Sequence, residues 1–251
     1  MEASSTSIVL AFVSVFFVAA LYSSVGHGGA SGYLAVLTLL AAPRLEMATT
    51  ALVLNVFVAG VAWVTFARAG RFSLSLTWPF IVLSVPAAFL GGALHVAGWV
   101  YSLALAAALL MAAWRLSVRF APGEKREIMA PSLSVAIPTG AGIGLVSGIV
   151  GIGGGVFLSP IIILSRLASP REAAATSALF IVVNSLAGLA GRLTRAGFQM
   201  GALWPLIFAG FAGGLVGSRF GANKFSNTVL RRTLAVVLVV AAGKLILNAT
   251  A

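Results

Sequence analysis

Cysteine is absent from the sequence, which excludes disulfide bridges, thiolate metal sites and cysteine nucleophiles. Charged residues are also scarce, at 8% of 251 residues, whereas 60% of the residues are hydrophobic. Because this much apolar surface exceeds what one core can bury, part of it must face lipid. The apolar runs are unbroken rather than alternating, so helices are expected instead of a barrel. The sequence therefore predicts an all-α polytopic membrane protein.

Acidic residues number only 5 against 16 Lys and Arg, which gives a net charge of +11. The basic residues stand singly or in pairs at the ends of apolar runs, and no basic stripe alternates with aromatics, so nucleic acid is not an expected partner. Twelve of the 16 fall on one predicted face, which the positive-inside rule places in the cytoplasm, with both termini external. On the other face, Arg192 and Arg195 are expected to attract anions at the mouth. No Lys or Arg precedes the first apolar run, which favours a retained membrane segment over a cleaved signal.

The chain consists of two similar halves. The segment VGHGGA at 25–30 matches VGIGGG at 150–155, and four further motif pairs follow in the same order. We expect a first transmembrane repeat at 1–116, a cytoplasmic linker at 117–130 and a second repeat at 131–251.

Each repeat is expected to open with a glycine-broken or re-entrant segment and to continue with three transmembrane helices. The first charge-free run, 8–42, is shorter than the roughly 40 residues that two full spans need. Two short helices, or one helix and a re-entrant piece, both fit this length. Since the three helices that follow are an odd number, the second repeat starts on the opposite face, and the repeats are inverted.

The paired glycine clusters are the first candidates for a binding site. Glycine tolerates positive φ and leaves backbone N–H groups uncovered, and a helix that restarts after such a break points its positive end into the membrane. Two inverted copies would hold an anion without a costly buried cation. The alternative is that the glycines permit close helix packing, which is the better interpretation of the GxxxG spacings at 210–221. The candidate binding glycines are Gly26, Gly28, Gly29, Gly151, Gly153, Gly154 and Gly155.

Polar side chains within the predicted spans are further candidates. They recur in near-equivalent places of the two halves as Thr49, Thr50 and Asn55, and as Thr176, Ser177 and Asn184. Hydroxyl and amide groups could bind an oxyanion, or they could form hydrogen bonds between helices. His27 stands in the first cluster where the second has Ile152, and it either binds the anion or is a packed polar residue.

Signals for an enzyme are weak. Gly29-Ala30-Ser31-Gly32 matches the GxSG motif of rhomboid intramembrane proteases, but only His27 and His95 are available as a base. No complete GxxxxGK[ST] motif occurs, and no metal or cofactor is expected. A serine protease using Ser31 is therefore the least supported alternative.

The segment VGIGGGVFLSP at 150–160, together with the two inverted-looking repeats, resembles the TauE/SafE sulfite exporter family over essentially the whole chain. The resemblance implies transport of sulfite, sulfonates or other small oxyanions. We expect a secondary transporter, and more specifically an exporter, that works by alternating access around a central site between the glycine breaks; an anion channel is the alternative. The expected location is the inner membrane, and the expected partners are the anion and the bilayer, with a homo-oligomer allowed.

Overall fold

The computed structural model describes residues 5–117, 129–196, 203–221 and 228–250. Within these ranges the chain is helical and contains no strand, which confirms the all-α prediction. The linker around Lys125 and the residue Ala251 lie outside the described residues. The helices, in chain order, are α1 (Ser5–Ser24), α2 (Ala30–Leu39), α3 (Arg44–Arg68), α4 (Leu74–Ala93), α5 (Gly98–Ser117), α6 (Leu133–Val150), α7 (Gly155–Leu164), α8 (Pro170–Ala196), α9 (Leu206–Gly221) and α10 (Thr228–Thr250).

Helices α2 and α7 are too short to cross a bilayer. Each has 10 residues, about 15 Å of helix against a hydrocarbon core of about 30 Å. Five helices, α3, α4, α5, α6 and α8, are long and apolar enough to span. Helix α2 folds back on α1. Its Gly32 lies so close to Val18 and Tyr22 of α1 that an added Cβ would contact both side chains. The structure thus favours one longer helix followed by a half-length piece, rather than two equal short helices.

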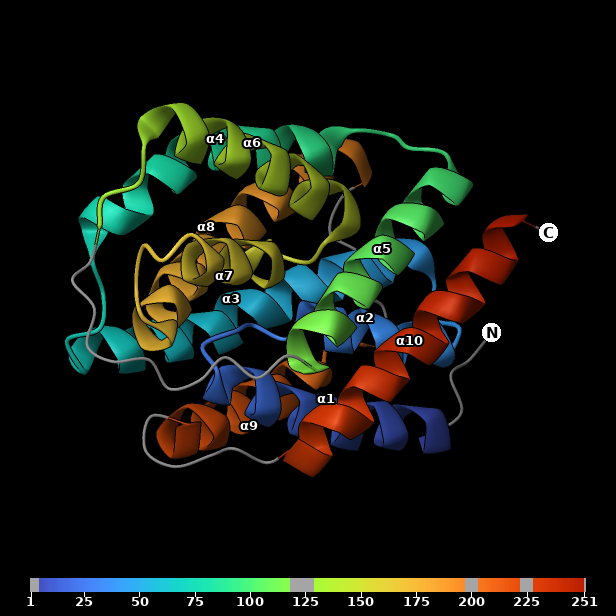
Figure 1. Cartoon of the computed structure of the whole chain (residues 1–251). Helices are drawn as coiled ribbons and strands as arrows, with labels where there is room; N and C mark the ends of the chain where they lie inside the picture. The colour runs from blue at the N-terminus through green and yellow to red at the C-terminus, as the bar shows by residue number, and fades with distance from the viewer. Residues whose placement is uncertain (1–4, 118–128, 197–202, 222–227, 251) are drawn as a thin grey trace.

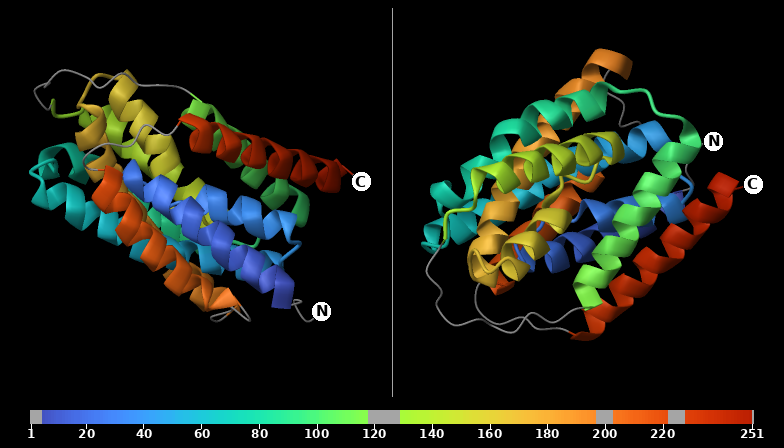
Figure 2. Two further views of the ribbon diagram at one scale, coloured as in Figure 1. Left: turned by 90° about the horizontal axis from the view of Figure 1, so that it is seen from below. Right: turned by 45° about the horizontal axis from the view of Figure 1, so that its top comes forward.

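The helix pairs at opposite edges of the molecule are formed by corresponding helices of the two predicted repeats (Figures 1 and 2). Helix α4 packs along α6 at one edge, and α9 packs along α1 at the opposite edge. Helices α3 and α8 contact each other between these pairs, and α5 packs against α10. Counting from the start of each half, α4 corresponds to α9 and α6 to α1, so both edges use the same pair of elements. The inverted orientation of the halves stays a prediction.

Small residues set the distance between the paired helices. Three glycines of α6 lie against backbone carbonyl oxygens of α4, namely Gly140 against Phe80, Gly144 against Ser84 and Gly148 against Ala88. On α9, Gly213 and Gly217 lie in the same way against the carbonyl oxygens of Phe16 and Ala20 of α1. Such contacts are possible only where no Cβ intervenes. The packing interpretation of these two glycines is confirmed.

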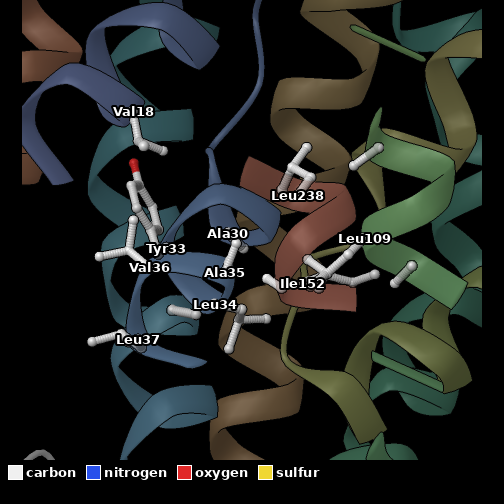
Figure 3. Packing of buried hydrophobic residues seen from close by; sticks show 14 of the residues in the cluster. Val18, Ala30, Tyr33, Leu34, Ala35, Val36, Leu37, Leu109, Ile152 and Leu238 are labelled. Carbon is white, nitrogen blue, oxygen red and sulfur yellow. The ribbon is translucent and has the colours of Figure 1, made fainter. Parts of the chain in front are cut away.

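The half-length helix α2 is enclosed by protein. Every residue from 30 to 38 is buried. In Figure 3, Tyr33 lies beside Val18 of α1, whereas Ala30 and Leu34 lie toward Ile152, Leu109 of α5 and Leu238 of α10. The non-helical residues 26–29 before α2 are buried as well, which shields their backbone from lipid. Large apolar side chains instead face outward on the long helices, for example Leu90 on α4 and Phe208 on α9.

Candidate functional site

The chain leaves helical geometry at both glycine clusters, as predicted. Helix α1 ends at Ser24 and α2 begins at Ala30, whereas α6 ends at Val150 and α7 begins at Gly155. We call residues 25–29 break 1 and residues 151–154 break 2. Both breaks contain backbone in the left-handed region, at Gly26, Gly29, Gly151, Gly153 and Gly154. Glycine is the residue that adopts this conformation without strain, which is why the helices stop there.

Each break passes close to a long helix of the other half. A Cβ added to Gly26 would lie 2.5 Å from the Cβ of Ala174 on α8, and one on Gly151 would lie 2.9 Å from the Cβ of Ala48 on α3. The two contacts correspond to each other: in each, a glycine of one half lies against an alanine near the start of the long helix of the other half. The breaks are therefore held against the interface between the halves, and the glycines allow that close approach.

Asn55 of α3 lies between the two breaks. A Cβ on Gly28 would overlap the Asn55 side chain, and one on Gly153 would lie 2.6 Å from its Nδ2. The Asn55 Nδ2 donates to the carbonyl of Ile152 at 3.2 Å and to the Ser185 hydroxyl at 3.3 Å. Asn55 is fully buried, and its Oδ1 has no hydrogen-bond partner among the described residues. One amide thus contacts both glycine clusters.

Asn184 does not occupy the equivalent place. Ala48 and Asn55 are seven residues apart on α3, and the same step from Ala174 on α8 leads to Ile181, whose Cγ2 lies against both Gly28 and Gly153. Asn184, one turn further along, donates to the Phe180 carbonyl of its own helix at 2.8 Å. The expected equivalence of the two asparagines is therefore wrong. The centre has an amide from the first half and an alkyl group from the second.

The four predicted hydroxyl residues are all buried, but they are differently placed. Thr176 accepts a hydrogen bond from Thr77 of α4 at 3.1 Å, and the Ser177 carbonyl lies beside Gly155. The hydroxyls of Thr50 and Ser177 have no hydrogen-bond partner among the described residues. Thr49 is buried on α3. The structure thus brings the Ser177 backbone to the first residue of α7, and it connects Thr176 to a neighbouring helix.

Two comparisons decide the family. The family model described as "Sulfite exporter TauE/SafE" matches residues 11–245. The chain is also 34% identical over 250 residues to "Probable membrane transporter protein y4hK" of Sinorhizobium fredii (strain NBRC 101917 / NGR234), covering 98% of this chain and all of that protein. This chain belongs to the TauE/SafE family. It is a multi-pass membrane transporter of the TauE/SafE type and not an enzyme. No solved structure matches it.

His27 connects the two halves of this TauE/SafE protein. Its Nε2 lies 2.9 Å from the hydroxyl of Ser159 on α7, and its Nδ1 lies 2.9 Å from the Val25 carbonyl. A carbonyl can only accept, so Nδ1 carries a proton, and in the neutral imidazole Nε2 then accepts from Ser159. Ser31 pairs instead with the hydroxyl of Tyr22 at 2.8 Å. The Ser31–His27 dyad that the protease alternative requires is thus not formed.

The sequence suggested that Arg192 lies in a loop at the mouth, but the structure places it elsewhere. It belongs to α8, is 4% exposed, and donates to the carbonyls of Gly148 and Ile149 at 3.0 and 2.6 Å. Both carbonyls belong to the last turn of α6, where the helix dipole favours a cation. Lys244 of α10 does the same for α2 through the carbonyls of Thr38 and Leu39. Both cations cap helix ends, and the Arg195 side chain lies outside what the structure describes.

Sequence reasoning missed four residues near the breaks in this TauE/SafE chain. Tyr33 donates to the Gly28 carbonyl at 2.7 Å, Tyr22 pairs with Ser31, and Ser185 accepts from Asn55. Arg115 lines a small cavity with His27. Of these, Tyr22 and Tyr33 could have been noticed as hydroxyls flanking the first glycine cluster within an otherwise apolar run.

We expect the two asparagines to differ in their contribution to stability. Asn55→Ala leaves the Ile152 carbonyl and the Ser185 hydroxyl without their buried donor, which costs about 1–3 kcal/mol. Asn184→Ala removes a bond within one helix turn and should cost less than about 1 kcal/mol. Thermal unfolding of both variants in the same detergent measures the difference. Equal losses would contradict the central placement of Asn55.

Proposed function

We propose that this protein exports a small anion, such as sulfite or an organosulfonate, by alternating access around a central site between the two breaks. The observation that carries the proposal is the convergence of both breaks on Asn55. Each break is followed by a half-length helix, and the N-terminal end of such a helix attracts an anion through its N–H groups and dipole. The family description and the relative's name support a transporter of this kind.

The substrate-binding residues of this proposal are those at the breaks and on the α3 and α8 turns beside them. Gly26, Gly28 and Gly29 would present backbone to the anion from the first half, as would Gly151, Gly153, Gly154 and Gly155 from the second. Asn55 is the side chain of this set that the structure places beside these glycines, and Ser177 lies beside Gly155 through its backbone carbonyl. His27, Thr49, Thr50, Thr176 and Asn184 stay candidates from the sequence.

Alternating access follows from the proposed architecture, with repeats at 1–116 and 131–251 joined by the linker 117–130. Rocking of one repeat against the other would open the shared centre to each side in turn. An interior-negative potential favours anion exit by about 2.3 kcal/mol per charge per 100 mV, so export needs no coupled ion. The described acidic residues Glu46 and Glu172 stand in the first turns of α3 and α8, and neither break contains a carboxylate in its own sequence.

Flux into proteoliposomes tests the proposed function. Purified protein should carry sulfite down its gradient with a rate that saturates as the sulfite concentration rises. Protein-free vesicles supply the baseline. A rate that stays proportional to concentration would indicate a channel, and an absence of flux with sulfite, thiosulfate and organosulfonates would reject small sulfur oxyanions as substrates.

The proposed inner-membrane orientation places the linker in the cytoplasm, His95 outside and both ends of the chain outside. Because the sequence has no cysteine, Lys125→Cys and His95→Cys introduce single labelling sites. In intact cells an impermeant thiol reagent should label position 95 and not position 125, and cell disruption should make both reactive. The reverse pattern would invert the topology.

A further inference from the structure

A small cavity lies beside break 1, between the last turn of α1, the last turns of α5 and the first turn of α7. Its volume is about 20 Å³, enough for one water molecule or for one oxygen atom of a bound anion. Its wall is formed by Tyr22, Val25, His27, Ala112, Arg115, Leu116 and Val156.

Three of the lining side chains are polar, and they come from two stretches of the chain, the end of α1 with break 1 and the last turn of α5. Tyr22 and His27 are 3% and 5% exposed, so the cavity reaches into the buried part of the protein. Arg115, in the last turn of α5, is their charged neighbour. The Tyr22 hydroxyl already pairs with Ser31, but a hydroxyl can donate once and accept twice, so it retains capacity for another partner.

The chemistry of this wall suits an oxyanion. A guanidinium offers several N–H donors in one plane, which match the oxygens of a sulfur or phosphorus oxyanion better than an ammonium does. The apolar remainder, Val25, Leu116 and Val156, limits competition from water, so a charge-assisted hydrogen bond is stronger there than at the surface. Val156 belongs to the first turn of α7, whose positive end adds to the field of Arg115.

The cavity has no counterpart of the same chemistry in the other half. Ile152 occupies in break 2 the place of His27 in break 1, and Ser147 matches Tyr22 at the same offset. Arg115 is followed directly by the linker that the charge pattern places in the cytoplasm. The polar cavity therefore lies on the side from which an exporter receives its substrate.

We propose that Arg115 and Tyr22 bind one oxygen of the transported oxyanion in this cavity, so that the substrate site extends from the centre toward the first half and Arg115 selects for negative charge. This inference rests on the proposed function and deepens it. His27 serves as a positioning residue, because its bonds to Val25 and Ser159 keep the cavity wall joined to α7.

The test measures sulfite flux into proteoliposomes as a function of sulfite concentration. Arg115→Gln should raise the half-saturating concentration about 10- to 100-fold, the range expected when a hydrogen bond from a charged group is lost. Arg115→Lys should retain part of the affinity, and Tyr22→Phe should lose about three- to tenfold. Arg68→Gln, at the exposed end of α3, removes the same charge away from the cavity and should match the parent.

The outcomes separate this inference from the proposed function. If the parent protein shows no sulfite flux, sulfite is rejected as the substrate and the inference loses its basis. If the parent transports sulfite and Arg115→Gln has the same half-saturating concentration, only the inference is overturned. A fall in the maximal rate alone also overturns it, because a structural role would produce that result. If Arg115→Gln fails to elute as folded protein, Arg115→Lys and Tyr22→Phe decide, and parent-like half-saturation in both overturns it.

Discussion

Gly144→Val should strongly destabilise the packing of α6 against α4. A Cβ at position 144 would overlap the carbonyl oxygen of Ser84 on α4, and a backbone atom cannot rotate away as a side-chain end can. The two helices would have to separate along a contact that also includes Gly140 and Gly148. Overpacking of this kind costs about 3 kcal/mol or more, because close van der Waals packing is a main force between membrane helices.

The same helix supplies the control. Gly142 has open space around its Cβ position, so Gly142→Val adds the same bulk and the same β-branch without a clash. We expect Gly142→Val to elute from size-exclusion chromatography as the parent does, and Gly144→Val to aggregate or to unfold about 6–12 °C lower. Parental stability of Gly144→Val would show that α4 and α6 are not held at this separation.

Gly28→Ala should nearly abolish transport without unfolding the protein. Gly28, unlike Gly26 and Gly29, is not in the left-handed region, so alanine fits its backbone. The added methyl group instead overlaps the side chain of Asn55 and displaces the amide from its place between the breaks. Displacement of a fully buried side chain costs about 1–3 kcal/mol, and we expect flux to fall at least about tenfold.

A double-variant cycle identifies the cause of that loss. If the clash with Asn55 is responsible, Gly28→Ala should add little further loss in an Asn55→Ala background. Flux of the two single variants and the double variant, each normalised to the amount of folded protein, gives the coupling. Independent effects of the two changes would contradict the proposed site, because Gly28 would then act through some other contact.

The positions of the breaks could be predicted from the sequence because their cause is local. Clustered glycine within an apolar run both permits left-handed backbone and removes side-chain packing, and it does so wherever the helix lies. The start of α4 and the end of α5 likewise lie close to the limits of one charge-free run, 72–114, whose length indicates two helices. No knowledge of tertiary contacts was needed for either.

The residues that face the breaks could not be predicted in the same way. Asn55 and Asn184 stand in near-equivalent places of the two halves, yet the three residues from Ile181 to Asn184 are almost one helical turn, so Ile181 and not Asn184 takes the place that corresponds to Asn55. Arg192 near the end of an apolar run looks like a loop cation, whereas its side chain reaches back to cap α6. Arg115 looked like one more cytoplasmic charge, and only the packing of α5 beside break 1 shows its place. Such placements depend on helix register and crossing, which one sequence does not encode locally.

Asn55 opposite Ile181 makes the two halves chemically unlike at the centre. Repeats with identical linings would give two end states related by symmetry, and an anion would bind equally well from either compartment. Under the proposed alternating-access mechanism, an amide on one half and an alkyl group on the other give the anion different surroundings in the two states, so we expect its apparent affinity to differ between the two compartments. An uncoupled carrier still has to obey detailed balance, so at zero voltage the ratio of maximal rate to half-saturating concentration is equal in both directions. The side with the tighter site is therefore also the side with the slower maximal rate.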